Sequence, residues 1–167
     1  MSPRRARRKG GTLKDGERRQ LARASRHAGA PVAPAPRDSA LVLCDGGSRG
    51  NPGPSAIAAV LYAPDGREVD RAVEAIGRAT AAAAEYRAIR LGIELAAAHD
   101  ADPLEVCSDS RLAIAALDGR KPADRELAAL VDQVRTAAAR FAVVRWRWHP
   151  RAENEAADAL VRELLWS

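Results

Sequence analysis

The sequence predicts an α/β protein with a five-stranded mixed sheet flanked by helices. Strand-like and helix-like segments follow one another in the order three strands, helix, strand, two helices, strand and helix. Short turns join the first three strands, which favours antiparallel pairing, whereas strands separated by helices usually return parallel. Apolar residues make up 47% of the chain, many of them are alanine, and only one is Phe. We therefore expect helices packed closely on the sheet, with few bulky side chains between them.

The charge distribution divides the 167 residues into two regions. Residues 1–38 carry eleven Lys/Arg and three Asp/Glu, a net charge of +8, and residues 29–38 hold three prolines. Residues 39–167 carry sixteen Lys/Arg and nineteen Asp/Glu, a net charge of −3. We expect a basic, disordered arm and linker over 1–38 and one catalytic domain over 39–167. The arm either contacts nucleic-acid phosphates or is a solvated tail that aids solubility.

Composition also limits where the protein acts. There is no apolar stretch of about 18 residues, which argues against a transmembrane helix. The Arg-rich start has no apolar segment behind it and so does not resemble a secretory signal, although an organellar transit peptide stays possible. Two cysteines, Cys44 and Cys107, form no disulfide framework. We expect a cytoplasmic protein, monomeric and without an obligate protein partner or membrane contact.

The first three strands are expected at residues 40–44, 55–62 and 67–76. The first is a short apolar run, and a turn rich in Gly and Pro follows it. The second and third form a hairpin around the turn at residues 64–66. Charged residues alternate with apolar ones in the third strand, so we expect one of its faces to be in water.

The rest of the chain alternates helices with strands. Thr80 is a plausible N-cap for a long helix that ends near residue 99. The further elements are a strand at 104–108, helices at 110–117 and 122–140, a strand at 142–149 and a final helix at 153–166. Trp146 and Trp148 are two residues apart and share one face of the last strand, where core packing is favoured over nucleic-acid stacking. Alternation also places Cys44 and Cys107 on opposite sides of the sheet, which argues against a disulfide.

Four acidic residues stand where they could converge. Asp45 and Asp109 follow the first and fourth strands, and neighbouring strand ends are where open sheets place ligands. Glu85 lies early in the long helix among small residues, and Asp158 lies in the final helix. Clustered carboxylates are the oxygen ligands that a pair of Mg²⁺ ions needs for phosphodiester cleavage. Taken alone, Asp109 could instead cap the helix that follows it.

Four segments resemble the motifs of type 1 ribonuclease H. They are Asp45–Pro54 (DGGSRGNPGP), Thr80–Gly92 around Glu85, Ser108–Ser110 (SDS) and Glu153–Leu160 (ENEAADAL). Their order and spacing agree with the family over residues 40–166, about three quarters of the chain. A GNPG turn alone would indicate only a tight loop. The sequence is similar to the ribonuclease HI-like branch that lacks the basic handle.

The resemblance implies a ribonuclease H-like fold and hydrolysis of the RNA strand of RNA–DNA hybrids, leaving 3′-hydroxyl and 5′-phosphate ends. It implies two Mg²⁺ ions, or Mn²⁺, held by Asp45, Glu85, Asp109 and Asp158, with Asp45 bridging both. Substrate contacts are expected at Gly46, Gly47, Ser48, Asn51, Ser110 and Arg151. The turn would read 2′-hydroxyls in the minor groove. Its glycines could also serve only a backbone that needs positive φ.

The sequence departs from the family pattern in the groups that contact substrate. Ala81 and Ala82 replace an asparagine pair, which suggests weaker or less selective hybrid binding. His149 lies at the very end of the expected last strand, whereas the family's catalytic histidine lies on a longer loop. His149 is either catalytic or a strand-end residue that points to solvent, and Arg151 is a rival candidate for phosphate contact. The segment after Arg120 leaves little room for a basic handle.

Two other functions stay open. One is a catalytically inactive ribonuclease H-like domain that only binds nucleic acid. The other is the same chemistry on double-stranded RNA or on RNA–DNA junctions. The presence of all four acids favours the active hybrid nuclease.

Deleting residues 1–38 tests the role of the basic arm. If the arm contacts phosphates, the truncated protein should bind a hybrid more weakly, because each neutralised phosphate releases counterions. Binding titrations over a range of salt concentrations should then give a shallower salt dependence than the full chain gives. An unchanged slope would leave the arm as a solvated tail.

Overall fold

The computed structural model describes Pro34 and residues 37–167. The remaining residues of the predicted arm, 1–33 and 35–36, lie outside the described part, and so does the predicted role of the arm. The strands are β1 (Ala40–Ser48), β2 (Gly53–Tyr62), β3 (Glu68–Ala79), β4 (Leu104–Ser108) and β5 (Val144–Trp148). The helices are α2 (Ala81–Ala98), α3 (Arg111–Leu117), α4 (Arg125–Ala138) and α5 (Glu155–Trp166), with a short 3-10 helix, η1 (Arg151–Asn154), before α5.

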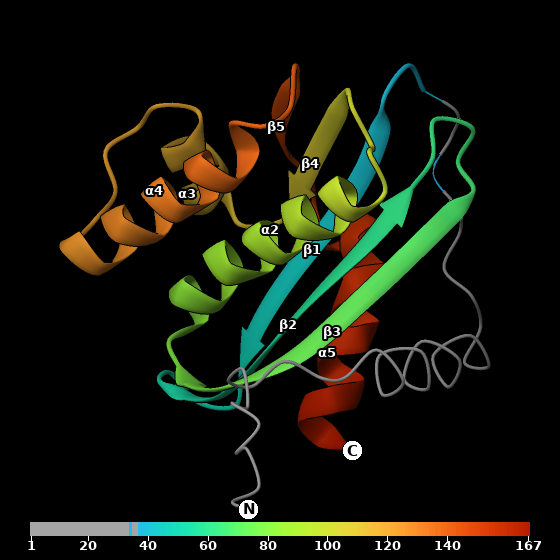
Figure 1. The fold of residues 1–167 in the computed structure, drawn as a ribbon. Coiled ribbons are helices and arrows are strands. Elements are labelled where there is room, and N and C mark those ends of the chain that lie inside the picture. The colour runs from blue at the N-terminus through green and yellow to red at the C-terminus, as the bar shows by residue number, and fades with distance from the viewer. Residues whose placement is uncertain (1–33, 35–36) are drawn as a thin grey trace, which may run out of the picture.

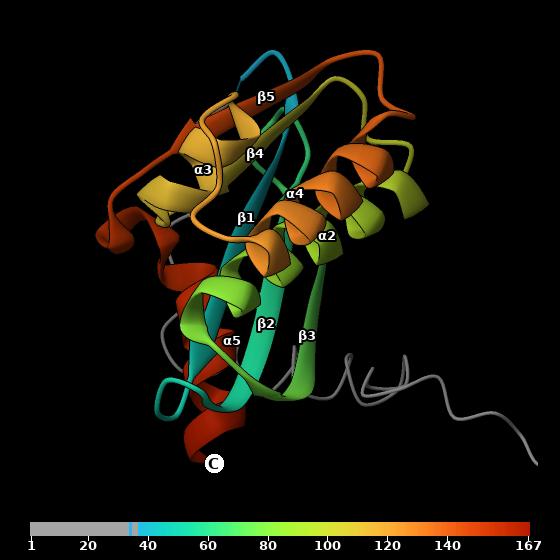
Figure 2. The same ribbon diagram turned by 90° about the vertical axis from the view of Figure 1, so that its left-hand side faces the viewer.

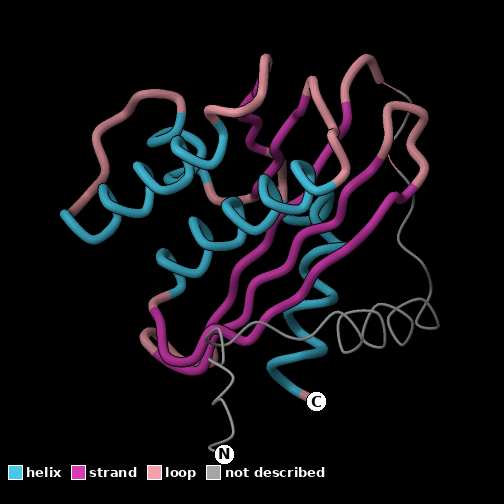
Figure 3. Tube along the Cα trace, in the orientation of Figure 1, coloured by secondary structure: helices cyan, strands magenta, loops and turns pink. Residues whose placement is uncertain are grey.

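The five strands form one mixed sheet in the order β3-β2-β1-β4-β5 (Figure 3). β1 pairs with β2, and β2 with β3, in antiparallel register, while β1, β4 and β5 run parallel. Both the five-stranded mixed sheet and the antiparallel pairing of its first three strands are therefore confirmed. β1 is the central strand, so its side chains are buried by elements on both faces of the sheet.

Helices cover both faces of the sheet. α2 and α3 pack on one face, with α4 against α2 on the same side, and α5 crosses the other face (Figure 1; Figure 2). Alternating residues of β1 enter two separate cores, because successive side chains of a strand point to opposite faces. Val42 and Cys44 pack under α2, whereas Leu41 and Leu43 pack under α5.

The central strand is longer than expected. The prediction ended the first strand at Cys44 and began a turn there, but β1 continues to Ser48. Gly46 and Gly47 pair with Ile57 and Ala56 of β2, which supplies the hydrogen-bond partners that keep them extended. The turn is confined to residues 49–52, and neither Gly46 nor Gly47 has positive φ.

The third strand also differs from its prediction. Alternation suggested one buried face and one wet face, but Ala72 lies in the core under α2 while Val73 lies in the core under α5. Both faces of mid-β3 are therefore covered. Arg71 is buried there too, with its guanidinium bound to Glu68.

Helix boundaries follow capping side chains. The predicted N-cap Thr80 is confirmed, because its Oγ1 accepts a hydrogen bond from the Ala83 amide at 3.1 Å. α4 begins at Arg125 and not at residue 122, because Asp124 accepts a bond from the Leu127 amide at 2.9 Å. Among the residues that the structure describes, no helix is both long enough and apolar enough to cross a membrane.

The cysteines and tryptophans lie as expected. Cys44 and Cys107 are free thiols, buried in the two different cores. Trp146 and Trp148 are partly buried and pack against the core on the α2 side of the sheet, which confirms the prediction of core packing.

Gly92 tests how tightly α2 packs on β1. A Cβ at this position would lie 2.5 Å from Cys44 Sγ and 3.1 Å from Val42 Cγ2. Helix propensity alone favours alanine over glycine by about 1 kcal/mol, whereas overpacking costs about 1–3 kcal/mol. We expect Gly92→Ala to lower the free energy of unfolding in urea denaturation. Net stabilisation would contradict the close contact.

Candidate metal and nucleic-acid site

The central strand supplies the first acidic residue of the site. Asp45 lies within β1, opposite Ala58 of β2, and is only 6% exposed. It is not at the strand end, as the sequence suggested, because β1 continues for three more residues. A buried carboxyl group in the centre of a sheet is costly to ionise unless a cation is close.

Helix α2 brings Glu85 to the same place. Gly46 makes this possible, because a Cβ on Gly46 would lie 2.3 Å from the backbone carbonyl carbon of Ala84. Only glycine allows the first turns of α2 to approach β1 so closely. The Gly46 amide and the Ser108 side chain both hydrogen-bond to the Glu85 carboxyl group.

The third acid follows β4. Asp109 lies between the end of β4 and the start of α3, and the indole Nε1 of Trp148 donates to its backbone carbonyl at 3.0 Å. Asp109 does not cap α3, so that alternative is wrong. The cap is Ser110, whose hydroxyl accepts from the Ala113 amide at 3.2 Å. The guanidinium of Arg111 lies over the Trp148 ring, 3.6 Å from its centroid.

These three acids form one cluster. Each of Asp45, Glu85 and Asp109 offers an oxygen that lies within 4.8 Å of the others. Burial, followed by repulsion from Asp109 and Asp158, raises the pKa of Asp45 to about 7. Burial, followed by repulsion from Asp45 and Asp109, raises the pKa of Glu85 to about 9. Burial also raises the pKa of Asp109, although Arg151 and His149 oppose the shift.

Asp158 lies beside the cluster but is bound to arginines. Its Oδ1 accepts from Arg151 at 3.0 Å, and its Oδ2 accepts from Arg162 at 2.9 Å. The three-residue cluster does not include it. Asp158 is nevertheless close enough to raise the pKa values of Asp45 and Asp109. The structure thus places all four predicted acids in one region, with the fourth neutralised by two guanidinium groups.

The cluster fits a hard divalent cation. Oε2 of Glu85 is buried and has no hydrogen-bond partner within the described part of the protein. Carboxylate oxygens at this spacing are the donors that Mg²⁺ and Mn²⁺ favour. A dication there would satisfy the Glu85 oxygen and relieve the repulsion that raises the three pKa values.

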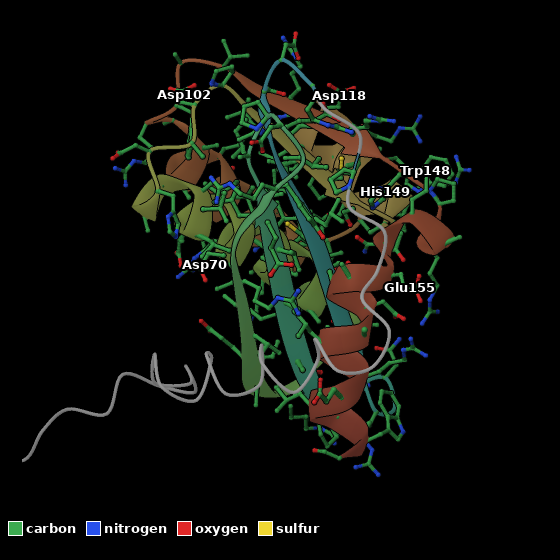
Figure 4. The ribbon with its side chains drawn as sticks, turned by 90° about the vertical axis from the view of Figure 1, so that its right-hand side faces the viewer. Asp70, Asp102, Asp118, Trp148, His149 and Glu155 are labelled. Atoms are coloured by element: carbon green, nitrogen blue, oxygen red, sulfur yellow. The ribbon has the colours of Figure 1, made fainter. Side chains whose placement is uncertain are left out.

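His149 has a buried position next to this site. It is only 5% exposed, which excludes the alternative that it points to solvent. Its Nε2 lies 3.1 Å from Asn154 Oδ1, and Asn154 Nδ2 donates to the Cys44 carbonyl at 2.9 Å. Burial lowers the pKa of His149. This chain of contacts ties the end of β5 to the residue before Asp45. Figure 4 labels His149 next to Trp148, and a catalytic role for His149 stays a prediction.

The end of β1 and the β1–β2 turn together carry most of the predicted substrate contacts. Asn51 is exposed, and its Oδ1 accepts from the Ala81 amide at the start of α2 at 3.1 Å. The Ser48 hydroxyl lies within hydrogen-bond distance of the carbonyls of Gly50 and Ala79. Gly47 lies against α5, where a Cβ would be 2.9 Å from Val161 Cγ1. Gly46 and Gly47 therefore have packing roles, and their contacts with substrate stay predictions.

The other predicted contacts lie on both sides of the cluster. Ser110 follows Asp109 and uses its hydroxyl to cap α3. The side chain of Arg151 is 74% exposed beside Asp158. Ala82 is exposed in the first turn of α2, close to Glu85 in the chain. Its methyl group leaves that surface without the amide found in the family pattern.

Sequence reasoning missed three supporting residues. The four-residue spacing of Asp158 and Arg162 on a helix was a usable signal for their ion pair. Asn154 stands within a recognised motif, yet nothing in the sequence shows that its amide reaches the Cys44 carbonyl. The bond from Trp148 to the Asp109 carbonyl likewise depends on the pairing of β4 with β5.

Several known proteins are similar to this chain in sequence. The reverse transcriptase-like family matches residues 43–164. "Bifunctional protein Rv2228c" of Mycobacterium tuberculosis is 37% identical over 127 residues, which is 75% of this chain and 35% of that protein. "Ribonuclease HI" of Halobacterium salinarum is 38% identical over 125 residues, which is 72% of this chain and 61% of that protein. The chain thus spans about a third to three fifths of the length of these relatives.

Solved structures show the same fold. The N-terminal RNase H domain of Rv2228c superposes with a TM-score of 0.72 at 36% identity, over 74% of this chain and 96% of that one. RNase H1 of Halobacterium salinarum gives 0.74 at 38% identity, over 75% and 96%. LC11-RNase H1, isolated from compost and solved in complex with an RNA/DNA hybrid, gives 0.69 at 28% identity, over 74% and 94%.

The acid cluster makes stability depend on pH. Asp45 and Glu85 have folded-state pKa values of about 7 and about 9, against 3.8 and 4.5 for the ordinary groups. Their protonation therefore stabilises the metal-free protein at low pH, and this contribution is lost as pH rises through about 7 and then about 9. We expect the melting temperature to fall between pH 6.5 and pH 9, and Mg²⁺ to reverse part of the fall.

Thermal melts of the wild type, Glu85→Gln and Glu126→Gln check this expectation. Glu126 is an exposed acid on α4 and serves as the matched control. Glu85→Gln should flatten the pH dependence and reduce the Mg²⁺ effect, whereas Glu126→Gln should match the wild type. If all three proteins respond alike, the clustered acids are not the cause.

Proposed function

Because the chain belongs to the reverse transcriptase-like, ribonuclease H-like family, we propose that it is a metal-dependent endonuclease that hydrolyses the RNA strand of RNA–DNA hybrids. The resemblance to type 1 ribonuclease H is confirmed by these relatives and structures. The proposal concerns residues 39–167, since the chain spans only part of its curated relatives. The convergence of Asp45, Glu85 and Asp109 is the observation that carries it.

The carboxylates would hold two Mg²⁺ or Mn²⁺ ions. Bound cations of this kind activate the attacking water and stabilise the leaving oxygen, and the resemblance implies 3′-hydroxyl and 5′-phosphate products. Asp45 would contact both ions, as the resemblance implies, and both Asp109 and Asp158 lie close enough to raise its pKa. The buried Oε2 of Glu85 has no hydrogen-bond partner among the described residues and would bind an ion. Asp158 would complete the donor set if it turned from Arg151 and Arg162 toward the ions.

The arginines and the turn would orient the substrate. Arg151 is exposed beside Asp158, and its planar guanidinium suits bidentate contact with a phosphate. The Ala81 amide donates a hydrogen bond to Asn51, which holds the exposed turn at residues 49–52 beside the start of α2. There the turn would contact 2′-hydroxyls in the minor groove of the hybrid. Ala81 and Ala82 supply no amide contacts there, so we propose weaker discrimination of the hybrid. A cytoplasmic, monomeric protein stays part of the same proposal.

A cleavage assay tests the function. Labelled RNA–DNA hybrid, double-stranded RNA and double-stranded DNA are incubated with the protein in Mg²⁺ or Mn²⁺. We expect cleavage of the hybrid's RNA strand, and a loss of more than about 100-fold for Asp45→Asn, because even residues that only support metal ligands are worth about 10–100-fold. Asp132→Asn, an exposed acid on α4, should behave as the wild type.

The remaining functions are outcomes of this assay. Binding of the hybrid without cleavage in either metal would select the inactive binding domain. Preferential cleavage of double-stranded RNA would select the alternative substrate. Cleavage that persists in Asp45→Asn would contradict the proposed metal site.

A further inference from the structure

An exposed line of arginines and one tryptophan leads away from the acid cluster along α5. We call it the α5 ridge and define it as Arg151, Arg162, Trp166 and Arg49. Asp158, Arg162 and Trp166 are spaced four residues apart, so they lie along one side of the helix. The ridge therefore begins at the fourth acid of the proposed site and ends at the last residue of α5.

The far end of the ridge meets the β1–β2 turn. Arg49 Nη1 donates to the Leu165 carbonyl at 3.1 Å. The Arg49 guanidinium carbon also lies 6.0 Å from the centroid of the Trp166 ring, within cation–π range. The Arg49 side chain thus joins the turn that contains Asn51 to the end of α5. The ridge and the turn therefore form a continuous surface.

Packing does not account for this surface. Trp166 is 61% exposed, and it is the one aromatic residue among the large exposed hydrophobics of the described chain. Arg162 is 58% exposed. Residues 39–167 have a net charge of −3, yet two guanidinium groups bind Asp158 at one end of the ridge and a third, that of Arg49, lies at the other end. Arg49 can be explained as a cap for the end of α5, but that role needs no exposed indole beside it.

We propose that the α5 ridge binds the RNA strand of the hybrid beyond the phosphate that is cleaved. This inference rests on the proposed function, because it continues the strand held at the acid cluster. The eight residue steps from Asp158 to Trp166 span about 12 Å at about 1.5 Å per residue. One strand advances about 3.4 Å per nucleotide, so the ridge matches about three to four nucleotides. Arginines suit the phosphates, and the indole suits stacking on a base.

Steady-state kinetics on hybrids with and without a single-stranded RNA extension test the ridge. Trp166→Ala should raise KM for the extended substrate about fivefold or more, with kcat unchanged, because stacking stabilises binding and not the chemical step. Trp166→Phe should keep most of the affinity. Arg49→Gln should raise KM and reduce the salt slope by about one, as expected for one lost phosphate contact.

Matched controls separate binding from stability. Val143→Ala shortens another exposed apolar residue, and Arg140→Gln removes a charge beside the C-terminal end of α2, away from Glu85. Both should leave KM unchanged. Melting temperatures of all variants show whether Arg49→Gln acts only by loosening α5. KM values equal to that of the wild type for both Trp166→Ala and Arg49→Gln would overturn the proposal that the α5 ridge binds the RNA strand.

Failure of the proposed function would be seen separately. If the wild type cleaves no hybrid, the affinity of the extended hybrid is measured by fluorescence anisotropy in EDTA. Weaker binding by Trp166→Ala than by Val143→Ala would still support the ridge. Equal binding would overturn it. If the wild type cleaves the hybrid but the variants match it, only the ridge is wrong.

Discussion

The close approach of α2 to β1 determines most of the site. Gly46 on β1 leaves room for the backbone of Ala84, and Gly92 on α2 leaves room for Cys44 and Val42. With a glycine on each partner, the helix lies close enough to the strand for Glu85 to reach Asp45. A side chain at Gly46 would push the helix away and separate the two acids. The cost of this arrangement is electrostatic, because two buried carboxyl groups then repel each other.

Neighbouring arginines offset the negative charge of the carboxylates. Arg151 and Arg162 neutralise Asp158 and oppose the rise in the pKa of Asp45. Asn154 and His149 hold β1 from the other side through the Cys44 carbonyl. The site is thus rigid around acids whose ionisation a dication would favour. The same two arginines begin the exposed surface that runs along α5, so charge balance at the proposed metal site and the proposed binding of the substrate strand would share residues.

The sheet, the order of its elements and the identity of the four acids were predictable, because each depends on local patterns and on recognised motifs. The four-residue spacing of Asp158 and Arg162 on a helix also indicates their ion pair. Other features depend on contacts between distant segments. β1 continues through Gly46 and Gly47 because β2 pairs with them, although glycines alone suggest a turn. His149 is buried at the end of β5 and contacts Asn154, which neither spacing nor composition reveals. Close approach at Gly46 likewise appears only when the helix is placed on the sheet.

Anomalous diffraction from crystals of the protein with Mn²⁺ and an RNA–DNA hybrid tests most directly whether the clustered carboxylates bind metal ions. Asp45→Asn is used if cleavage must be prevented. We expect the anomalous peaks to lie between the carboxylates of Asp45, Glu85 and Asp109. We also expect Asp158 to turn from its arginine partners toward the metal ions. Peaks elsewhere on the protein, or none at saturating Mn²⁺ in crystals of the wild type, would contradict it.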